Sequence, residues 1–282
     1  MKRLCLIGIP LFTYGNSMNL VRAVRWKIKE KRELNLSVFD LILERFDSNL
    51  RESNFNDFFS NLPKQLLKER FDLNIPEGMV PRSLKEVLID RIYERLPAFI
   101  PKPGEIVIDI GAQFGDYAYL CAKKFGAEVF SFEPLRKNYE IMLEFLRVNR
   151  VNNVHTYNVA IGAENRIVEM MGNTDMIFSP EIYVKNMMEH GTGEIRTLDS
   201  FKITAPSIVK IDVEGFEMEV LIGAEETLRL KPKIIVETHT KELRSQVIQH
   251  LEGHGYKLIY ESATKKSSRN RMEVNELYLI GA

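Results

Sequence analysis

The sequence has 282 residues, of which 45% are hydrophobic and 28% are charged, the balance of an ordinary globular protein. A chain of this length has room for one large domain, or for one domain with an extension. Its 39 Lys and Arg residues equal its 39 Asp and Glu residues, so the formal net charge is zero. This balance gives no overall electrostatic case for nucleic-acid binding, and no nucleic-acid partner is expected.

The N-terminal segment is strongly basic. Residues 1–32 contain eight Lys or Arg residues and one acid, Glu30, so the segment carries +7 on a chain of zero net charge. This favours an anionic partner such as a membrane surface, and the alternative is a solvated helix face. No apolar stretch reaches the ~18 residues of a membrane span. The two cysteines, Cys5 and Cys121, form neither a disulfide framework nor a metal-ligand spacing. We expect a cytoplasmic protein with peripheral membrane contact.

Residues 1–100 are expected to form a mainly helical N-terminal extension. Apolar residues recur with helical spacing over 19–32 and again over 38–46. A third helix is predicted over 83–96, where Ser83 and the Glu three positions later resemble a capping box.

Residues 101–282 alternate between short apolar runs and amphipathic helices, which predicts a doubly wound, Rossmann-like α/β sheet. The predicted strands are 106–110, 128–132, 154–159, 207–211, 233–237, 256–260 and 276–280. The predicted helices are 116–124, 136–150, 217–228 and 243–253. The last two strands lack a helix between them and are expected to pair as an antiparallel hairpin. Residues 164–195 are expected to be an irregular lid or substrate loop.

A glycine turn follows the first predicted strand. Its sequence is Asp109-Ile-Gly111-Ala-Gln113-Phe-Gly115, and the two glycines allow the backbone to turn sharply and approach a ligand. The spacing is not the Gly-x-Gly-x-x-Gly of dinucleotide-binding proteins. An acid two residues before the first glycine would repel a pyrophosphate and suits a cationic ligand. The alternative is a plain strand-to-helix turn.

The next two strand ends supply further candidate ligand contacts. Glu133, followed by Pro134, lies 24 positions after Asp109 and can accept hydrogen bonds from both hydroxyls of a ribose. The third strand ends near Asn158 and Ala160, which are expected to flank the adenine of a nucleotide-like ligand. Turn chemistry explains this Asn equally well.

Acids and a histidine gather at the ends of the fourth and fifth strands. Asp212, Glu214 and Glu217 follow the fourth strand, and Glu237 and His239 end the fifth. Asp212, Glu214, Glu237 and His239 are predicted to be catalytic, with His239 as a general base at neutral pH. The alternative is a helix N-terminus that favours acids through its dipole. The other histidines are interpreted as non-functional: His155, His190, His250 and His254.

Together these motifs resemble the FkbM-type methyltransferases, over about residues 105–237 with a weaker tail to 282. The residues that carry the resemblance are Val107-Ile-Asp109-Ile-Gly111-Ala, Glu133-Pro134, Val159-Ala-Ile-Gly162, Arg196-Thr-Leu198-Asp199, Lys210-Ile-Asp212-Val-Glu214-Gly215-Phe-Glu217, Leu221-Ile-Gly223-Ala and Glu237-Thr-His239. The Lys-Ile-Asp-Val-Glu-Gly-x-Glu stretch is the specific one, whereas the glycine turn is common to many methyltransferases.

The resemblance implies a seven-stranded methyltransferase fold that uses S-adenosylmethionine (SAM) and methylates a hydroxyl oxygen of a saccharide or another small molecule. The SAM-contacting positions that it implies are Asp109, Gly111, Gly115, Tyr117 and Glu133. Gln113 departs from the Asn that is common in the family, although the longer amide can still reach the ligand.

The expected reaction is an in-line methyl transfer, with catalysis mainly by positioning of the two reactants. This interpretation requires no metal ion, but the four predicted catalytic residues could also form an oxygen-rich divalent site. Two other functions stay open. One is an oxidoreductase with an NAD-type cofactor, against which the glycine spacing and Asp109 count. The other is a non-catalytic binding module on the same fold.

Overall fold

A computed structural model describes most of the chain after residue 90 and short segments before it. The described residues are 2–6, 9–14, 67, 71–79, 81–88, 91–170, 191–262, 265–266 and 273–281. The chain divides into two compact units, residues 1–66 and residues 67–282.

The described part of the first unit is a β-hairpin. Strand β1 (Lys2–Leu6) pairs antiparallel with β2 (Ile9–Tyr14). This hairpin lies before the first predicted helix, in a local run rich in Leu, Ile, Phe and Tyr, which favours strands. The helices predicted over 19–32 and 38–46 lie outside the described residues.

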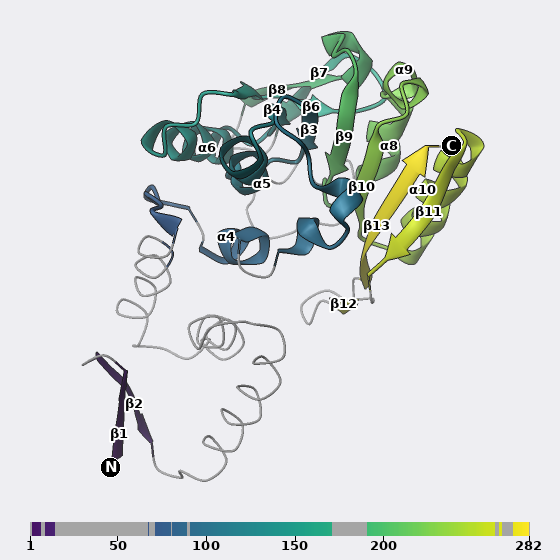
Figure 1. Ribbon diagram of the computed structural model, residues 1–282. Coiled ribbons are helices and arrows are strands. Elements are labelled where there is room, and N and C mark those ends of the chain that lie inside the picture. The colour runs from purple at the N-terminus through teal and green to yellow at the C-terminus, as the bar shows by residue number, and fades with distance from the viewer. Residues whose placement is uncertain are drawn as a thin grey trace. The chain divides into compact units, whose positions relative to one another are not determined.

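The second unit is built around a mainly parallel sheet (Figure 1). The strands lie in the order β11-β13-β10-β9-β3-β4-β5, and short β12 pairs with β13. Their bounds are β3 Ile106–Ile110, β4 Glu128–Phe132, β5 Val154–Tyr157, β9 Pro206–Ile211, β10 Lys233–Thr238, β11 Tyr256–Glu261, β12 Lys265–Lys266 and β13 Glu273–Gly281. β13 runs antiparallel to both β10 and β11, so the predicted C-terminal hairpin is confirmed.

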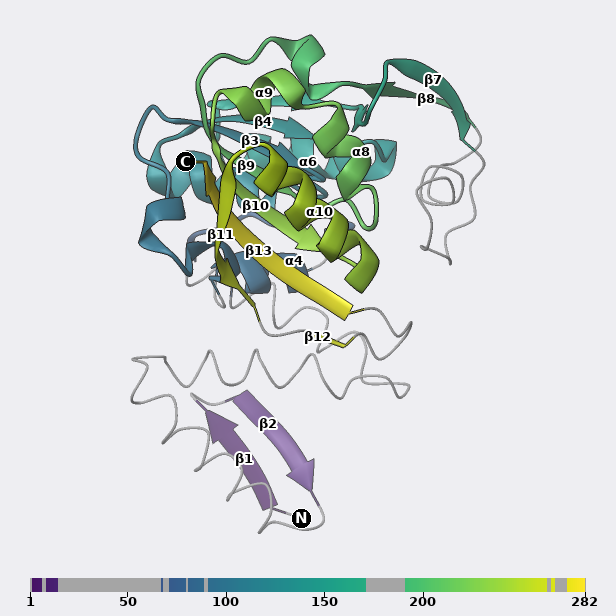
Figure 2. The ribbon, with the colours of Figure 1, turned by 90° about the vertical axis from the view of Figure 1, so that its right-hand side faces the viewer.

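Helices cover both faces of this sheet (Figure 2). α5 and α6 lie on one face, and α8 and α10 lie on the other. The helices of this unit are α4 Pro81–Leu88, α5 Asp116–Tyr119, α6 Arg136–Val148, α8 Glu217–Ile222, α9 Glu225–Arg229 and α10 Lys241–Gly253, with a π-helical turn, η3, over Leu120–Lys124. The predicted doubly wound α/β class is therefore confirmed.

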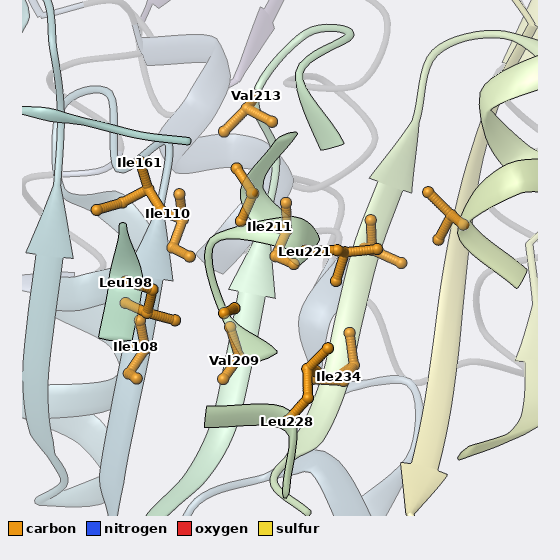
Figure 3. Close-up of a cluster of buried hydrophobic side chains, with 14 of the residues drawn as sticks. Ile108, Ile110, Ile161, Leu198, Val209, Ile211, Val213, Leu221, Leu228 and Ile234 are labelled. Atoms are coloured by element: carbon orange, nitrogen blue, oxygen red, sulfur yellow. The ribbon is translucent and has the colours of Figure 1, made fainter. Parts of the chain in front are cut away.

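The core lies between the sheet and the helices that cover it (Figure 3). Side chains of β3 and β9, among them Ile108, Ile110, Val209 and Ile211, pack with Leu221 of α8. The near-continuous apolar runs of these strands are what a sheet covered on both faces requires.

The topology places the candidate site. The chain runs from β3 outward through β4 to β5, and then returns to β9 on the other side of β3. Ligands of open α/β sheets bind at such a switch point, beyond the carboxyl ends of the strands. The motifs after β3, β4, β9 and β10 therefore share one edge of the sheet.

Two predicted elements differ from the structure. The ends of segment 164–195 are not irregular, because β7 (Arg166–Met170) pairs antiparallel with β8 (Gly191–Arg196), which also pairs with β6 (Ala160–Ile161). Residues 171–190 lie outside the described part of the chain.

The second difference is in the helices. The helix predicted over 217–228 is divided into α8 and α9 at Gly223, where an added Cβ would lie 1.9 Å from the carbonyl oxygen of Gly162. In place of the single helix predicted over 83–96, the described residues contain α4 (Pro81–Leu88) and a 3-10 turn, η1 (Ile92–Glu94), which begins after Arg91, whose φ is 54°.

Residues 67–100 fall within the second compact unit. The Tyr278 hydroxyl donates a hydrogen bond of 2.7 Å to the carbonyl oxygen of Ile92. The Tyr93 ring meets the Tyr117 ring edge-on, with 4.7 Å between centroids. These contacts join the segment to α5 and β13.

Candidate active site

The glycine turn after β3 packs directly on the start of the acidic motif after β9. Gly111 has φ 78°, and a Cβ there would lie 1.8 Å from the carbonyl oxygen of Asp212. Gln113 and Gly115 also have positive φ, 49° and 78°, and a Cβ on Gly115 would lie 2.7 Å from Met142. At Gly111, where φ is positive and a neighbouring backbone carbonyl is this close, only glycine fits. The two motifs are thus held against one another.

A buried lysine links the same two motifs. Lys210 of β9 lies opposite Asp109 of β3, and its ammonium is 3.2 Å from the Asp109 carboxylate. It also donates a hydrogen bond of 2.9 Å to the carbonyl oxygen of Gly111 and lies 3.8 Å from Asp212. Burial lowers the Lys210 pKa, but the nearby carboxylates outweigh burial and raise it above its usual range. Lys210 therefore stays charged.

Asp109 already has a cation as its partner. Its side chain is fully buried, and among the described residues its carboxylate is ion-paired with Lys210. Burial raises the Asp109 pKa, and Lys210 opposes that rise. The cation that Asp109 was predicted to attract is therefore Lys210 of the protein itself. This ion pair holds the Lys210 ammonium against the glycine turn.

A second buried acid begins helix α5. The Asp116 carboxylate accepts a hydrogen bond of 2.7 Å from the backbone N–H of Tyr117. Burial raises the Asp116 pKa to about 6, although Lys210 and a hydrogen bond from Ser83 oppose the rise.

Glu133, at the end of β4, is anchored from both sides. One carboxylate oxygen accepts a hydrogen bond of 2.8 Å from the backbone N–H of Gln113, and the other accepts one of 2.9 Å from that of Leu135. Burial raises the Glu133 pKa to about 7, while these backbone donors and Asn138 oppose the rise. The carboxylate is therefore fixed beside the glycine turn, with acceptor capacity left for hydroxyl donors.

The other predicted cofactor residues divide into two groups. The Asn158 amide donates hydrogen bonds of 2.9 and 3.0 Å to the carbonyl oxygens of Glu133 and Pro134, so these three lie together. Ala160 is buried in β6, and Tyr117 is buried on α5 with 2% of its surface exposed. The structure places Ala160 and Tyr117 in packed surroundings rather than on an open surface.

The predicted catalytic residues do meet. The Nδ1 atom of His239 lies 2.6 Å from the carboxylate of Glu217, which is fully buried on α8. The other ring nitrogen, Nε2, faces three carboxylates: Glu214 at 3.4 Å, and Asp212 and Glu237 at 3.8 Å each. Four acids from two strand ends and one helix thus surround one imidazole.

This arrangement sets the charge of the imidazole. Burial lowers the His239 pKa, but the hydrogen bond and charge of Glu217 and the charges of Glu214 and Asp212 raise it to about 10. Burial also raises the Glu214 pKa, and His239 opposes that rise. His239 therefore carries its proton at neutral pH in the ligand-free protein and offsets part of the surrounding negative charge.

The cluster has the donor set of a divalent cation site as well. Asp212, Glu214 and His239 each offer one ligand atom, and these atoms lie within 4.8 Å of one another. Carboxylate oxygens and an imidazole nitrogen suit Mn²⁺ or Zn²⁺.

Sequence reasoning gave too little weight to Lys210, Asp116 and Glu217. A lysine inside an apolar strand, two residues before an acid, was the available signal for Lys210. No signal along the chain could pair Glu217 with His239, because the two residues come from different elements that only the fold brings together.

Comparisons with known proteins identify the family. The model of the methyltransferase FkbM domain matches residues 109–258, just over half of the chain. This chain belongs to the FkbM methyltransferase family. The match begins at Asp109 and includes the glycine turn, Glu133 and the whole acidic cluster, so the resemblance seen in the sequence is confirmed.

A curated relative and two solved structures are similar to this chain. The hexuronic acid methyltransferase AglP of Haloferax volcanii is 28% identical over 145 residues, which cover 48% of this chain and 56% of the relative. The FkbM methyltransferase structure from Methylobacillus flagellatus is 18% identical with a TM-score of 0.48, covering 79% of this chain and 60% of that one. A precorrin-6y C5,15-methyltransferase structure from Geobacter metallireducens is 14% identical with a TM-score of 0.43, covering 75% and 93%.

The chain thus spans less than two thirds of the length of AglP and of the Methylobacillus protein. Among the described residues, no helix combines the length and the apolar character needed to cross a membrane.

Proposed function

We propose that this protein is a SAM-dependent O-methyltransferase that acts on a hydroxyl of a saccharide or a related small molecule. Membership of the FkbM family supports methyl transfer, and the likeness to a hexuronic acid methyltransferase supports a sugar acid as the acceptor class. The observation that carries the proposal is the contact of the glycine turn with Asp212, because it brings a nucleotide-type binding turn against an acidic cluster.

The residues around the glycine turn fit the chemistry of SAM. Glu133 is fixed at the end of β4 by two backbone N–H groups, which leaves its carboxylate able to accept hydrogen bonds from ribose hydroxyls. Asn158 and Pro134 lie beside it and would border the adenine, whereas Gly111 and Gly115 keep the turn free of side chains. When bound, SAM supplies an electrophilic methyl group on a positively charged sulfur.

The acidic cluster would bind the acceptor and take its proton. The Glu214 and Asp212 side chains are 39% and 27% exposed, whereas His239 is 3% exposed. A hydroxyl approaching from solvent therefore meets the two carboxylates first, and His239 lies behind them with Nε2 directed at both. A protonated imidazole cannot accept a proton, so in this proposal Glu214 and Asp212, rather than His239 as expected from the sequence, orient the hydroxyl and accept its proton. Glu237 and His239 hold them in position, and Glu217 holds His239.

Calorimetric titration of the purified protein with SAM and with NAD tests the cofactor. We expect micromolar binding of SAM, no binding of NAD, and loss of SAM binding in Glu133→Ala. Lys137→Ala, an exposed change on α6, is the control and should bind SAM as the wild type does. Binding of NAD would favour the oxidoreductase hypothesis. If the folded protein binds neither SAM nor NAD, the non-catalytic binding module becomes the favoured hypothesis.

Methylation of uronic acids tests the acceptor and the cluster. We expect SAM-dependent methylation of a uronic-acid glycoside, detected by mass spectrometry, with kcat reduced at least ~100-fold in Glu214→Gln and Asp212→Asn. The SAM dissociation constant should change less than about threefold in both variants. Activity on neutral sugars alone would reject the sugar-acid assignment and leave O-methylation standing.

We also propose that the basic segment 1–32 binds anionic membrane surfaces, on the strength of its charge alone. Co-sedimentation with vesicles of phosphatidylglycerol should capture the full chain at low salt and release it at high salt. Equal capture by neutral vesicles would contradict an electrostatic contact.

A further inference from the structure

A second group of metal-ligating side chains lies away from the acidic cluster. Glu225 begins α9, His250 is in the last turn of α10, and His254 caps the end of α10. One ligand atom from each lies within 4.8 Å of the others. The spacing of four places both imidazoles on one side of the helix end, and their ring centroids are 4.5 Å apart.

Both Nε2 atoms face the same carboxylate. His254 Nε2 lies 2.8 Å from one oxygen of Glu225, and His250 Nε2 lies 3.7 Å from the other. Ligand atoms held about 2.0–2.2 Å from a tetrahedral Zn²⁺ are about 3.3 Å apart, so the two observed distances bracket the required one. Small side-chain rotations would therefore close the site around an ion.

Hydrogen bonding already orients one of the ligands. His254 Nδ1 lies 2.9 Å from the carbonyl oxygen of His250, and because a carbonyl can only accept, Nδ1 carries a hydrogen. His254 Nε2 also hydrogen-bonds to the Glu225 carboxylate and therefore carries a hydrogen too. A metal ion would displace that proton and bind the Nε2 lone pair. A backbone carbonyl on the remote nitrogen is the usual support of a metal-bound histidine. His250 Nε2 is buried and has no hydrogen-bond partner among the described residues.

Nearby cations have partners of their own. Lys231 donates a hydrogen bond of 2.5 Å to the carbonyl oxygen of His254, and Arg229 forms its ion pair with Glu226. In the part of the chain that the structure describes, the ion pairs of the Glu225 carboxylate are those with the two imidazoles. An incoming cation would therefore not have to displace a lysine or an arginine from this carboxylate.

Glu225, His250 and His254 lie too far from the candidate active site to take part in the proposed methyl transfer. α10 begins after the carboxyl end of β10 and runs back to the start of β11, and α9 precedes the start of β10. His250, His254 and Glu225 thus lie toward the amino ends of the strands, at the opposite edge from Asp212 and His239. An ion here would tie the start of α9 to the end of α10.

We propose that Glu225, His250 and His254 form a site for a divalent transition-metal ion of the zinc type, with water completing its coordination. Two imidazoles and one carboxylate are the ligand types that Zn²⁺ takes in proteins. Because the ion would bind the folded arrangement and not the unfolded chain, it would stabilise the protein by mass action. This inference does not depend on the proposed methyltransferase activity.

The test is a zinc titration of the full chain, after treatment with EDTA and desalting, without SAM. We expect the double variant His250→Ala/His254→Ala to bind one Zn²⁺ fewer than the wild type, whatever the acidic cluster binds. In thermal melts, saturating zinc should raise the wild-type Tm by about 5 °C or more, and the double variant should lose that rise.

A matched pair of acids gives the control. Glu225→Gln should weaken zinc binding at least ~10-fold, whereas Glu226→Gln, which alters the adjacent acid that pairs with Arg229, should leave it unchanged. Equal zinc stoichiometry and equal Tm shifts in the wild type and the double variant would overturn the proposal. His254 would then serve only as a cation at a helix C-terminus, paired with Glu225.

Discussion

Glu133 and Asp116 are carboxyl groups whose protons the folded protein retains more strongly than the unfolded chain does. Burial raises the Glu133 pKa from 4.5 to about 7 and the Asp116 pKa from 3.8 to about 6. Between the unfolded and the folded pKa, the folded state binds more protons, so the free energy of unfolding falls as pH rises. Residues arranged for a ligand commonly have such perturbed values.

We therefore predict that the free energy of unfolding decreases from pH 5 to pH 8. Glu133 contributes at most about 3 kcal/mol of that decrease, because its pKa returns to its ordinary value in the unfolded chain. Denaturant unfolding at several pH values should show a shallower dependence in Glu133→Gln than in the wild type. Parallel curves for the two proteins would show that Glu133 keeps an ordinary pKa.

The same carboxylate gives SAM binding its own pH dependence. If ribose hydroxyls donate to ionised Glu133, affinity for SAM should rise between pH 6 and pH 8 and then level off. Calorimetric titrations across this range would measure it. In Glu133→Gln the affinity should be weak and nearly independent of pH, and a wild-type affinity that does not change with pH would place the ribose elsewhere.

Two glycines separate the effect of backbone conformation from that of close approach. Gly104 has φ 80° with open space around its α-carbon, whereas Gly111 has φ 78° and would place a Cβ 1.8 Å from the Asp212 carbonyl oxygen. We predict that Gly104→Ala costs about 1–2 kcal/mol of stability and keeps SAM binding. Gly111→Ala should cost clearly more and abolish SAM binding, as thermal melts and calorimetry would show. Equal costs would mean that the turn tolerates displacement from Asp212.

At the scale of elements, β3 and β4 were predicted with their observed bounds because their residues form apolar runs between turn signals. β6, β7 and β8 were missed because no apolar alternation distinguishes them, and they pair only with one another. The break between α8 and α9 was missed because it depends on Gly162, which is distant in sequence. The candidate site was predicted only in part for the same reason. The residues at each strand end were recognisable in the sequence, but the pairings of Lys210 with Asp109 and of Glu217 with His239 arise from packing.

Lys210 joins β9 to β3 electrostatically, and its removal should be costly. In Lys210→Met the buried Asp109 loses its partner, so we predict a loss of about 3–5 kcal/mol at pH 8, and a smaller loss at pH 5, where Asp109 can be protonated. Lys124→Met removes an ion pair with Glu94 from a lysine that is 49% exposed, and Glu94 keeps its ion pair with Arg91. This change should cost less than about 1 kcal/mol. Chemical denaturation at both pH values would compare them. A pH-independent loss in Lys210→Met would point to packing rather than charge.

At the scale of the whole molecule, the boundary of the second unit decides what can fold alone. Every residue of the candidate active site lies after residue 67, and so do the contacts that Ile92 and Tyr93 make with Tyr278 and Tyr117. The composition of residues 67–100 gave no sign of this, because their prolines and charges resemble a linker. The contacts of Ile92 with β13 and of Tyr93 with α5 show that this segment is part of the second unit.

Two shortened chains test this boundary. A chain of residues 67–282 should unfold cooperatively and bind SAM like the full protein, because it retains the whole second unit. A chain of residues 101–282 would uncover the buried Tyr278 and Tyr117 rings and remove Arg95, which lies 3.1 Å from buried Glu276. Removing an ion-pair partner of a buried carboxylate and exposing apolar surface costs several kcal/mol. We therefore expect the shorter chain to aggregate or to melt at least ~10 °C lower. Equal melting temperatures and equal SAM affinity would support the expected domain boundary at residue 101.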